Sequence, residues 1–155
     1  KAASGADLLP HMIAGILEFV PDITVFLNPT EASYARLGRD KAPKYVSWSS
    51  ENRSQLVRVP AAEGEFRRAE LRSPDPGANP YLSFALLIHA AMDGMEAGLT
   101  LPPATDRNLY AAEASVLRQL KRLPQDHAEA AQLARDSAFV RRHLPQMLID
   151  AYCAR

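Results

Sequence analysis

The sequence is short of cysteine, of net charge and of long apolar runs, and each shortage excludes a class of protein. Its single cysteine, Cys153, cannot form an internal disulfide or a cysteine-based metal cluster, which fits a reducing, cytoplasmic setting. Its 18 Lys and Arg residues balance 18 Asp and Glu residues, so no global field favours nucleic acid or an anionic membrane. No uninterrupted apolar run approaches the roughly 20 residues that span a bilayer. We therefore expect a cytoplasmic protein with no nucleic-acid and no membrane partner.

Several sequence signatures of catalysis and targeting are also missing. The chain has no glycine-rich phosphate loop, no dinucleotide-binding fingerprint and no nucleophile elbow. Its histidines show neither metal-ligand spacing nor a nucleophile partner; they are His11, His89, His127 and His143. The first residues, from Lys1, include no initiator methionine and no signal-peptide run, so we expect the chain to begin inside a longer one. If the protein binds a nucleotide, arginine side chains must hold it.

The composition is that of one folded unit in which helices and short strands are combined. Hydrophobic residues make up 47% of the 155 residues and charged residues 23%, as in soluble domains. The apolar spacing predicts a helix over 7–20 that ends at Pro21. Three β-rich segments follow, at 45–49, 55–59 and 66–72, and the last two are joined by a connection of hairpin length.

The second half of the sequence predicts helices separated by prolines. Asn79 and Pro80 form a helix start, and residues 81–98 carry apolar side chains on nearly every face, so this helix should be buried all round. Further helices are predicted at 108–120, 126–135 and 144–152. The fold should therefore end in a helical tail.

Basic residues are concentrated between Arg36 and Arg72. This stretch holds nine basic and five acidic residues, a local charge of +4 in a chain of zero net charge. The strand period places Arg68, Glu70 and Arg72 on one face of the third β-rich segment. Arginine binds carboxylate and phosphate through two parallel hydrogen bonds, so the group suits a polyanionic ligand, and Glu70 could help to hold Mg²⁺ there. The alternative from composition alone is a solvated sheet face with surface ion pairs.

Five linked motifs in this region resemble a known family. They are Asn28-Pro29-Thr30 with Arg36-Leu37, Trp48-Ser49 with Asn52-Arg53-Ser54, Glu70-Leu71-Arg72 with Asn79-Pro80-Tyr81, Asp93-Gly94, and Asn108-Leu109-Tyr110. Their order and spacing are similar to those of the second half of the glutamine synthetase catalytic domain. The resemblance runs from about Leu8 to Tyr110 and continues more loosely to the end of the chain.

The resemblance implies an α+β fold: an antiparallel piece of the family's catalytic sheet, backed by helices, with a helical C-terminal tail. Residues 1–110 would be the C-terminal portion of the catalytic domain, and residues 111–155 the helical tail of the same domain. The parent protein would be an ATP-dependent glutamate–ammonia ligase that acts through a γ-glutamyl phosphate and assembles as a homo-oligomer. The family's N-terminal half, with further metal carboxylates, has no counterpart here, so we expect the isolated chain to be inactive.

The resemblance also implies roles for individual residues. Arg36 and Arg72 would bind the substrate glutamate, and Glu70 would be one ligand of Mg²⁺ or Mn²⁺. The nucleotide-binding residues would be Arg53, Arg58 and Arg68. Among these, Arg53 would be the catalytic residue that stabilises the transferring phosphoryl group. These roles agree with the local positive charge, because phosphoryl transfer depends on positioning and on charge neutralisation.

The sequence departs from the family pattern at two places. These departures leave the acceptor amine of the reaction open. The family's loop carries a glutamate just before Ala42-Pro43 that takes a proton from ammonium, whereas Lys41 stands at that place here, with Asp40 beside it as an imperfect substitute. The hairpin loop at 61–65 is one residue shorter and lacks a nucleotide-contacting lysine of some members. Two alternatives stay open: a γ-glutamyl ligase that uses another amine, and a non-catalytic structural or regulatory relative.

Overall fold

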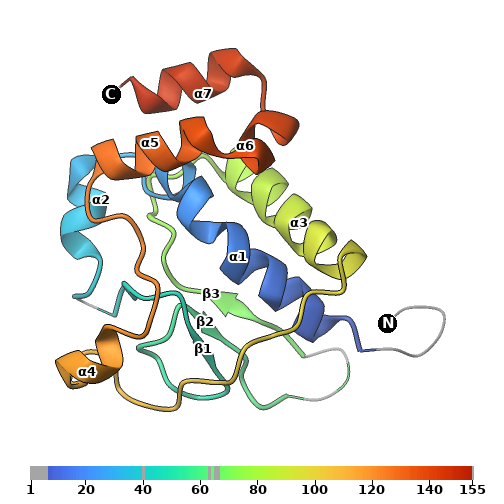
Figure 1. Cartoon of the computed structure of the whole chain (residues 1–155), viewed down its shortest axis with the longest axis vertical. Helices are drawn as coiled ribbons and strands as arrows, with labels where there is room; N and C mark the ends of the chain where they lie inside the picture. Colours follow the sequence, from blue (N-terminus) through green and yellow to red (C-terminus); the bar gives the residue numbers. More distant parts are fainter. Residues whose placement is uncertain (1–6, 40, 63, 65–66, 155) are drawn as a thin grey trace.

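The computed structural model describes residues 7–39, 41–62, 64 and 67–154. Its elements in chain order are α1 (Leu9–Leu27), α2 (Glu31–Arg36), β1 (Trp48–Ser49), β2 (Val57–Arg58), β3 (Glu70–Leu71), α3 (Pro80–Glu96), α4 (Ala114–Leu117), α5 (His127–Asp136), α6 (Ala138–His143) and α7 (Gln146–Cys153). Most helices gather at one end of the molecule, and a small three-stranded sheet lies at the other (Figure 1). The expected α+β class is confirmed.

The longest helix, α1, runs through a proline and lies at the centre of the core. The prediction that it ends at Pro21 is wrong, because the helix continues to Leu27. Val20 and Ile23, on either side of the proline, are completely buried. The Thr24 hydroxyl donates a hydrogen bond of 2.7 Å to the carbonyl oxygen of Val20. Burial of this apolar turn outweighs the roughly 3 kcal/mol that an internal proline costs a helix.

By length and composition, α1 could cross a membrane, and it is the one helix of the described ranges that could. In the folded chain, 56% of its most apolar window is buried inside the molecule. The core helix of a globular protein passes the same test of length and composition. A single helix of this kind therefore does not by itself indicate a membrane location.

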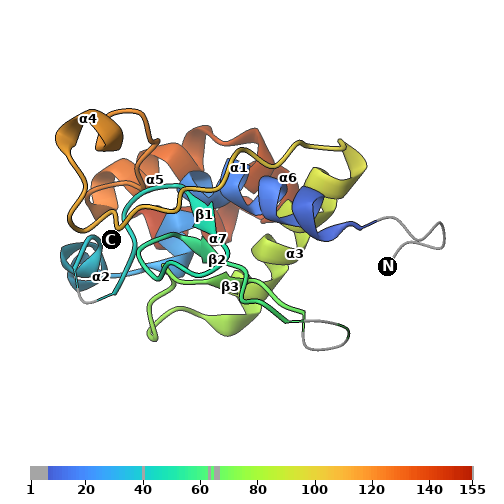
Figure 2. The same cartoon turned by 90° about the horizontal axis from the view of Figure 1, so that it is seen from below.

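Helices α1 and α3 lie side by side and meet at two glycines (Figure 2). A Cβ atom on Gly15 would collide with the carbonyl oxygen of Ala90, and a Cβ atom on Gly94 would collide with that of His11. Because glycine has no Cβ, the two backbones can approach this closely. The glycine pair therefore fixes where the two helices cross.

The expectation that α3 is buried all round is wrong. Leu86 is completely buried, but Tyr81, Phe84 and Ile88 are 85%, 66% and 56% exposed, and Met92 is 42% exposed. These four exposed residues recur every three or four positions, so they lie on one face of the helix. We call them the α3 apolar face. The apolar pattern of the sequence could not show which side of α3 has a neighbour in this chain.

The sheet is small and mixed. The expected antiparallel pairing is present between β2 and β3, but β1 pairs with β2 in parallel, which the antiparallel expectation did not include. The start of the first predicted strand pairs elsewhere: Tyr45 forms a bridge with Arg122, and the Val46 amide donates to the carbonyl oxygen of Lys121 at 2.8 Å. Tyr45 and Val46 thus pair with the segment before α5. Of the predicted strand, only Trp48 and Ser49 pair with β2.

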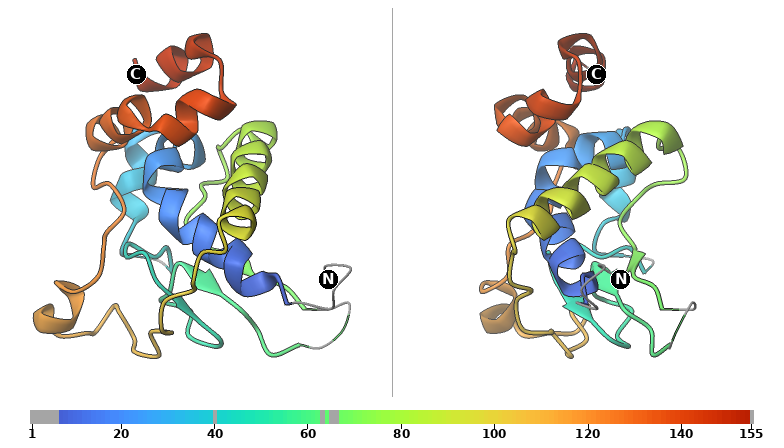
Figure 3. Two further views of the ribbon diagram at one scale, coloured as in Figure 1. Left: turned by 45° about the vertical axis from the view of Figure 1, so that its right-hand side comes forward. Right: turned by 90° about the vertical axis from the view of Figure 1, so that its right-hand side faces the viewer.

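The C-terminal helices α5, α6 and α7 pack on the end of α1 that lies away from the sheet (Figure 3). Phe139 of α6 stacks on Phe19 of α1, with ring centroids 4.2 Å apart. Tyr152 of α7 lies against Phe26, with centroids 5.2 Å apart. The predicted helices at 126–135 and 144–152 correspond to α5 and α7, whereas α6 was not predicted.

The helix predicted over 108–120 is wrong except for the single turn of α4. The backbone before α4 is held by the loops of the sheet end. The Leu109 amide donates to Ser54 Oγ at 2.9 Å, and the Thr105 amide donates to the carbonyl oxygen of Trp48 at 2.8 Å. Backbone amides that donate to such distant partners cannot also form helical hydrogen bonds. The prediction used only residues 108–120, which do not include these partners.

Candidate active site

Glu70 lies at the centre of an arginine cluster on the sheet. The antiparallel register of β2 and β3 places Arg58 opposite Glu70. The Arg58 guanidinium holds both carboxylate oxygens, because Nε donates to Oε2 at 3.0 Å and Nη2 donates to Oε1 at 2.9 Å. Arg68 Nη2 lies 3.3 Å from Glu70 Oε1. We call these three residues the Glu70 cluster. The structure brings Arg68 and Glu70 together, whereas Arg72, which the strand period places on the same face, bonds to the loops at Arg53 and Lys41.

The cluster keeps Glu70 ionised and sets two cations around one anion. Hydrogen bonds from Arg58 hold the pKa of the Glu70 carboxyl below its ordinary value, with the charges of Arg58 and Arg68 in support and desolvation in opposition. Two guanidinium groups around one carboxylate leave a net charge of about +1 on these three groups. The Arg68 side chain is 55% exposed, so it can reach a ligand in solvent. The arrangement suits an additional anion such as a phosphate.

Arg72 ties together two loops that carry other predicted site residues. Its Nε donates to the carbonyl oxygen of Arg53 at 3.1 Å, and its Nη2 donates to that of Lys41 at 3.2 Å. Burial raises the pKa of the nearby Tyr110 phenol, and the charge of Arg72 opposes this rise. An arginine carries five N–H donors, so Arg72 can hold both loops and still offer Nη1 to a ligand carboxylate.

Arg53 lies in a tight turn, and its side chain is exposed. The Asn52 side chain shapes this turn, because its Oδ1 accepts hydrogen bonds from the Ser54 amide at 2.9 Å and the Ser54 hydroxyl at 2.8 Å. Ser54 Oγ in turn accepts from the Leu109 amide, which anchors the turn to the segment before α4. The Arg53 guanidinium is therefore exposed to solvent, while Arg72 holds the Arg53 carbonyl oxygen.

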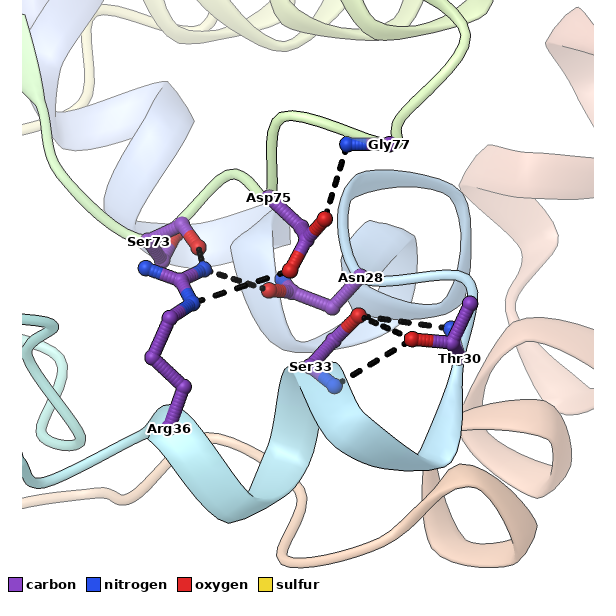
Figure 4. A network of polar contacts seen from close by, with 7 residues as sticks. All are labelled: Asn28, Thr30, Ser33, Arg36, Ser73, Asp75 and Gly77. Atoms are coloured by element: carbon purple, nitrogen blue, oxygen red, sulfur yellow. Dashed lines mark hydrogen bonds and ion pairs between the residues drawn. The ribbon is translucent and has the colours of Figure 1, made fainter.

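Arg36, at the end of α2, lies in a separate polar network (Figure 4). Its Nη2 donates to Asn28 Oδ1 at 3.2 Å and to the carbonyl oxygen of Ser73 at 2.7 Å, and its Nε lies 3.7 Å from Asp75 Oδ2. The other carboxylate oxygen of Asp75 accepts from the Gly77 amide at 2.8 Å. The network joins the end of α1 to the turn before α3. Arg36 thus has protein partners where the sequence predicts a glutamate carboxylate, and it does not share the Glu70 cluster.

The sequence builds the helix that carries Arg36 through a capping box. The Ser33 amide donates to Thr30 Oγ1, and the Thr30 amide donates to Ser33 Oγ, each at 3.3 Å. The short helix then places Arg36 in its last turn, where a cation complements the helix dipole. The sequence reasoning missed Asn28 and Asp75 as partners of Arg36. The available signal was their place in the sequence: Asn28 belongs to one of the five motifs, and Asp75 lies between prolines in the segment that joins the two halves of another.

The described residues do not form a metal site on their own. No group of three or more His, Cys, Asp or Glu side chains that could hold a metal ion occurs among them. Both oxygens of Glu70 already pair with arginines. Mg²⁺ requires nearly octahedral coordination by oxygen. The predicted Mg²⁺ or Mn²⁺ therefore does not fit the described residues without further ligands.

The loop that carries Lys41 has an unusual backbone. Lys41 is exposed and adopts a φ of 67°, and among the described residues it is the only one other than glycine with a positive φ. Gly38, in the same turn, has a φ of 87°. The Gly38 amide donates to the carbonyl oxygen of Ala42, and the Ala42 amide donates to that of Arg39, each at 2.8 Å. Asp40, the expected substitute base, lies outside the described residues.

Comparisons with known proteins agree with the motifs. The sequence profile described as "Glutamine synthetase, catalytic domain" matches residues 1–155. A glutamine synthetase of Methanosarcina mazei is 37% identical over 149 residues, which cover 94% of this chain and 33% of the relative. That of Thermus thermophilus is 39% identical over 137 residues, which cover 86% of this chain and 31% of the relative. The chain thus spans about a third of the length of the relatives it matches.

A solved structure has a similar fold. It is a GmaS/ADP complex in its conformation 1, with a TM-score of 0.81 and 25% sequence identity, and the match covers 99% of this chain and 36% of that chain. The similarity therefore includes the sheet, the α1–α3 pair and the helical tail. The resemblance indicated by the motifs is confirmed: the chain belongs to the glutamine synthetase catalytic-domain family.

Proposed function

We propose that this chain forms the nucleotide- and glutamate-binding part of an ATP-dependent glutamate–ammonia ligase that acts through a γ-glutamyl phosphate. The observation that carries the proposal is the Glu70 cluster, in which Arg58 of β2 and Arg68, which precedes β3, surround one ionised carboxylate. Family membership supports it. A protein of similar fold, GmaS, has been solved in complex with ADP.

In this proposal, arginine side chains supply most of the charge neutralisation. Arg58 and Arg68 bind the nucleotide phosphates from the sheet, and Arg53 stabilises the phosphoryl group as it passes from ATP to the γ-carboxylate of glutamate. Arg72 and Arg36 bind the glutamate. The amine then attacks the acyl carbon and displaces phosphate. The exposure of Arg53 and the spare donors of Arg72 support these roles.

Arg36 is the weakest member of this set, because its partners in the structure are Asn28, Ser73 and Asp75. For it to bind glutamate, a spare N–H of its guanidinium must serve the substrate while the network stays in place. Glu70 is proposed as one ligand of Mg²⁺ or Mn²⁺, which would neutralise the charge of the nucleotide phosphates when bound. The remaining ligands must come from outside the described residues.

We also propose that the chain works within a larger assembly. Its partners would be the other two thirds of the family's chain length and neighbouring copies in a homo-oligomer, in the cytoplasm. Residues 1–110 and 111–155 would act as parts of one catalytic domain. The α3 apolar face supports such partners, because large exposed apolar residues gathered on one helix face mark a surface that another segment covers.

A second candidate function, ligation of an amine other than ammonia, rests on Lys41. A lysine ammonium donates hydrogen bonds and accepts none, so it cannot take a proton from ammonium. Its position in a strained loop whose carbonyl is held by Arg72 favours a specific role for this residue.

A chimera tests the proposed function. In it, this chain replaces the matching third of the Thermus thermophilus glutamine synthetase. We expect phosphate release that requires ATP and glutamate together with ammonium or another small amine. A correctly assembled chimera that releases no phosphate with any acceptor, beside an active parent enzyme, would favour the non-catalytic relative instead.

A further inference from the structure

A polar cleft lies between α2 and the segment before α4. It has a volume of about 380 Å³, and its wall includes residues of α2, Gly38 and Arg39, Lys44 and Tyr45, Ser54, and residues of the segment at 109–117. This volume lies within the range of small-molecule pockets, roughly 300–1,000 Å³. No residue described on its wall is one to which the family resemblance assigns a role. The cleft therefore uses other side chains than the proposed nucleotide and glutamate sites, although Ser54 and Tyr110 lie next to Arg53 and Arg72.

The charged side chains on the cleft wall are both cations. Arg39 and Lys44 line the cleft, and no Asp or Glu among the described residues does. Neither cation forms an ion pair with a carboxylate in the described part of the chain. Isolated surface cations are usually solvated and mean little. Two of them on one concave wall, with the Arg72 charge reaching the neighbouring Tyr110, raise the local potential for an anion.

The rest of the wall is partly apolar. Leu37 and Leu109 are buried, and Leu117 adds a third aliphatic side chain. Tyr45 and Tyr110 contribute phenol rings. An inorganic anion would leave this apolar wall unused, whereas a short hydrocarbon body would cover it and gain from its burial.

We propose that this cleft binds a small aliphatic carboxylate. The anionic group pairs with Arg39 and Lys44, and the hydrocarbon body lies against the leucines of the wall. The turn at 38–42 forms part of the cleft and also contains Lys41, whose carbonyl oxygen Arg72 holds. The binding itself does not depend on the proposed ligase reaction.

Titration of the 155-residue chain with succinate, followed by NMR chemical shifts, tests the proposal. We expect saturable binding with a Kd in the millimolar range or below, since roughly 4 kcal/mol is within reach of two charge-assisted contacts. Arg39→Gln and Lys44→Gln should each weaken binding at least about fivefold and leave the spectrum of the folded chain intact. Arg67→Gln, a cation that pairs with Asp7 away from the cleft, and Arg58→Gln should leave the affinity unchanged.

Four results would overturn the proposal. One is the absence of saturable binding to the folded chain. A second is equal weakening by Arg67→Gln, which would indicate unspecific charge attraction. A third is loss of binding on Arg58→Gln alone, which would place the anion at the Glu70 cluster. The fourth is binding of phosphate or neutral succinamide as tight as that of succinate. Since none of these readouts uses catalysis, failure here leaves the proposed ligase function to be tested separately.

Discussion

The Arg58–Glu70 ion pair fixes the orientation of the two charged side chains on β2 and β3. Its two parallel hydrogen bonds fix both side chains in one plane, which a lysine, with a single ammonium, could not do. Arg68 adds a second ion pair to one of the same carboxylate oxygens. A lone carboxylate in this place would attract cations, whereas a carboxylate held by two guanidinium groups does so less.

Arg53 is the residue for which the proposed role makes the sharpest kinetic prediction. In the chimera, Arg53→Ala should lower kcat by about 10³-fold while changing the KM for ATP by no more than about threefold, because a guanidinium aimed at transferring charge acts mainly in the transition state. Steady-state kinetics at varied ATP concentrations measure both constants. An effect confined to KM would contradict the catalytic role. Arg67→Ala, another exposed arginine, serves as the matched control.

The acceptor amine depends on Asp40 and Lys41. If the chimera uses ammonia, Asp40→Asn should depress the ammonia-dependent step about tenfold or more and leave acyl phosphate formation intact, since general-base catalysis contributes at least about 10²-fold. If it uses another amine, Lys41→Glu should raise the use of ammonia. Rates with ammonia and a panel of small amines distinguish these cases. If the unsubstituted chimera, Asp40→Asn and Lys41→Glu all use the same amines at the same relative rates, the loop only covers the site.

One contact of the arginine pattern, between Arg68 and Glu70, could be predicted from the sequence, whereas the partners of Arg72 could not. The shared face of Arg68 and Glu70 is a property of residues two positions apart. The pairing of Glu70 with Arg58 depends on the register between β2 and β3, and the bonds of Arg72 join residues 19 and 31 positions away. Such contacts are set by tertiary packing. For the same reason the sequence predicted Arg36 as a ligand residue without its protein partners.

At the scale of elements, the crossing of α1 and α3 depends on Gly15 and Gly94. Gly15→Ala and Gly94→Ala should each destabilise the chain by about 1–3 kcal/mol, although alanine normally favours a helix, because the new methyl group meets the backbone of the partner helix. Urea unfolding followed by circular dichroism measures the change. Glu18→Ala, at an exposed position of α1, should be nearly neutral. Stabilisation by the glycine replacements would show that the helices do not cross as described.

The contact between α3 and α6 should be sensitive to pH. His143 stacks on His89 with ring centroids 3.9 Å apart and also contacts Phe139; Asp93 and Arg142 lie beside it. Burial, followed by the charge of His89, lowers the pKa of His143 below its ordinary value, with Arg142 in the same direction and Asp93 in opposition. The folded chain therefore favours the neutral imidazole. Its contribution to stability is present above about pH 6.5 and is lost as the pH falls through the lowered folded pKa.

The variant His143→Phe tests this pH dependence. It keeps an aromatic ring in the stack and removes the titration. Between pH 8 and pH 5.5, the urea midpoint of the wild type should fall further than that of His143→Phe. Equal falls in the two proteins would show that His143 is not the group responsible.

Elements differed in how far the sequence could define them. The capped helices α3 and α5 were predicted closely, because Asn79 and Asp126 bond to backbone amides within their own first turns. The continuation of α1 beyond Pro21 was missed, because the burial that stabilises it comes from other segments. The exposure of one face of α3 was missed for the converse reason: its apolar residues have no neighbour in the described chain.

At the scale of the whole molecule, the chain has a well-packed core, but part of its surface is apolar and exposed. The core joins α1 to α3 and to the tail helices, while the α3 apolar face remains exposed. The described residues also lack a group of His, Cys, Asp or Glu side chains that could hold a metal ion. Both features support the proposal that other parts of a larger protein complete the site, and the chain spans about a third of the length of its relatives.

Trapping of the acyl phosphate tests this central claim most directly. Hydroxylamine attacks the acyl carbon of γ-glutamyl phosphate and displaces phosphate, so ATP- and glutamate-dependent γ-glutamyl hydroxamate reports the intermediate whichever amine is the natural acceptor. The isolated 155-residue chain should give no hydroxamate above background. The chimera should give it, and chimeras with Arg58→Gln or Glu70→Gln should lose at least about tenfold of the rate. Hydroxamate formed by the isolated chain at an enzyme-like rate, or a rate unaffected by both substitutions in the chimera, would contradict the claim.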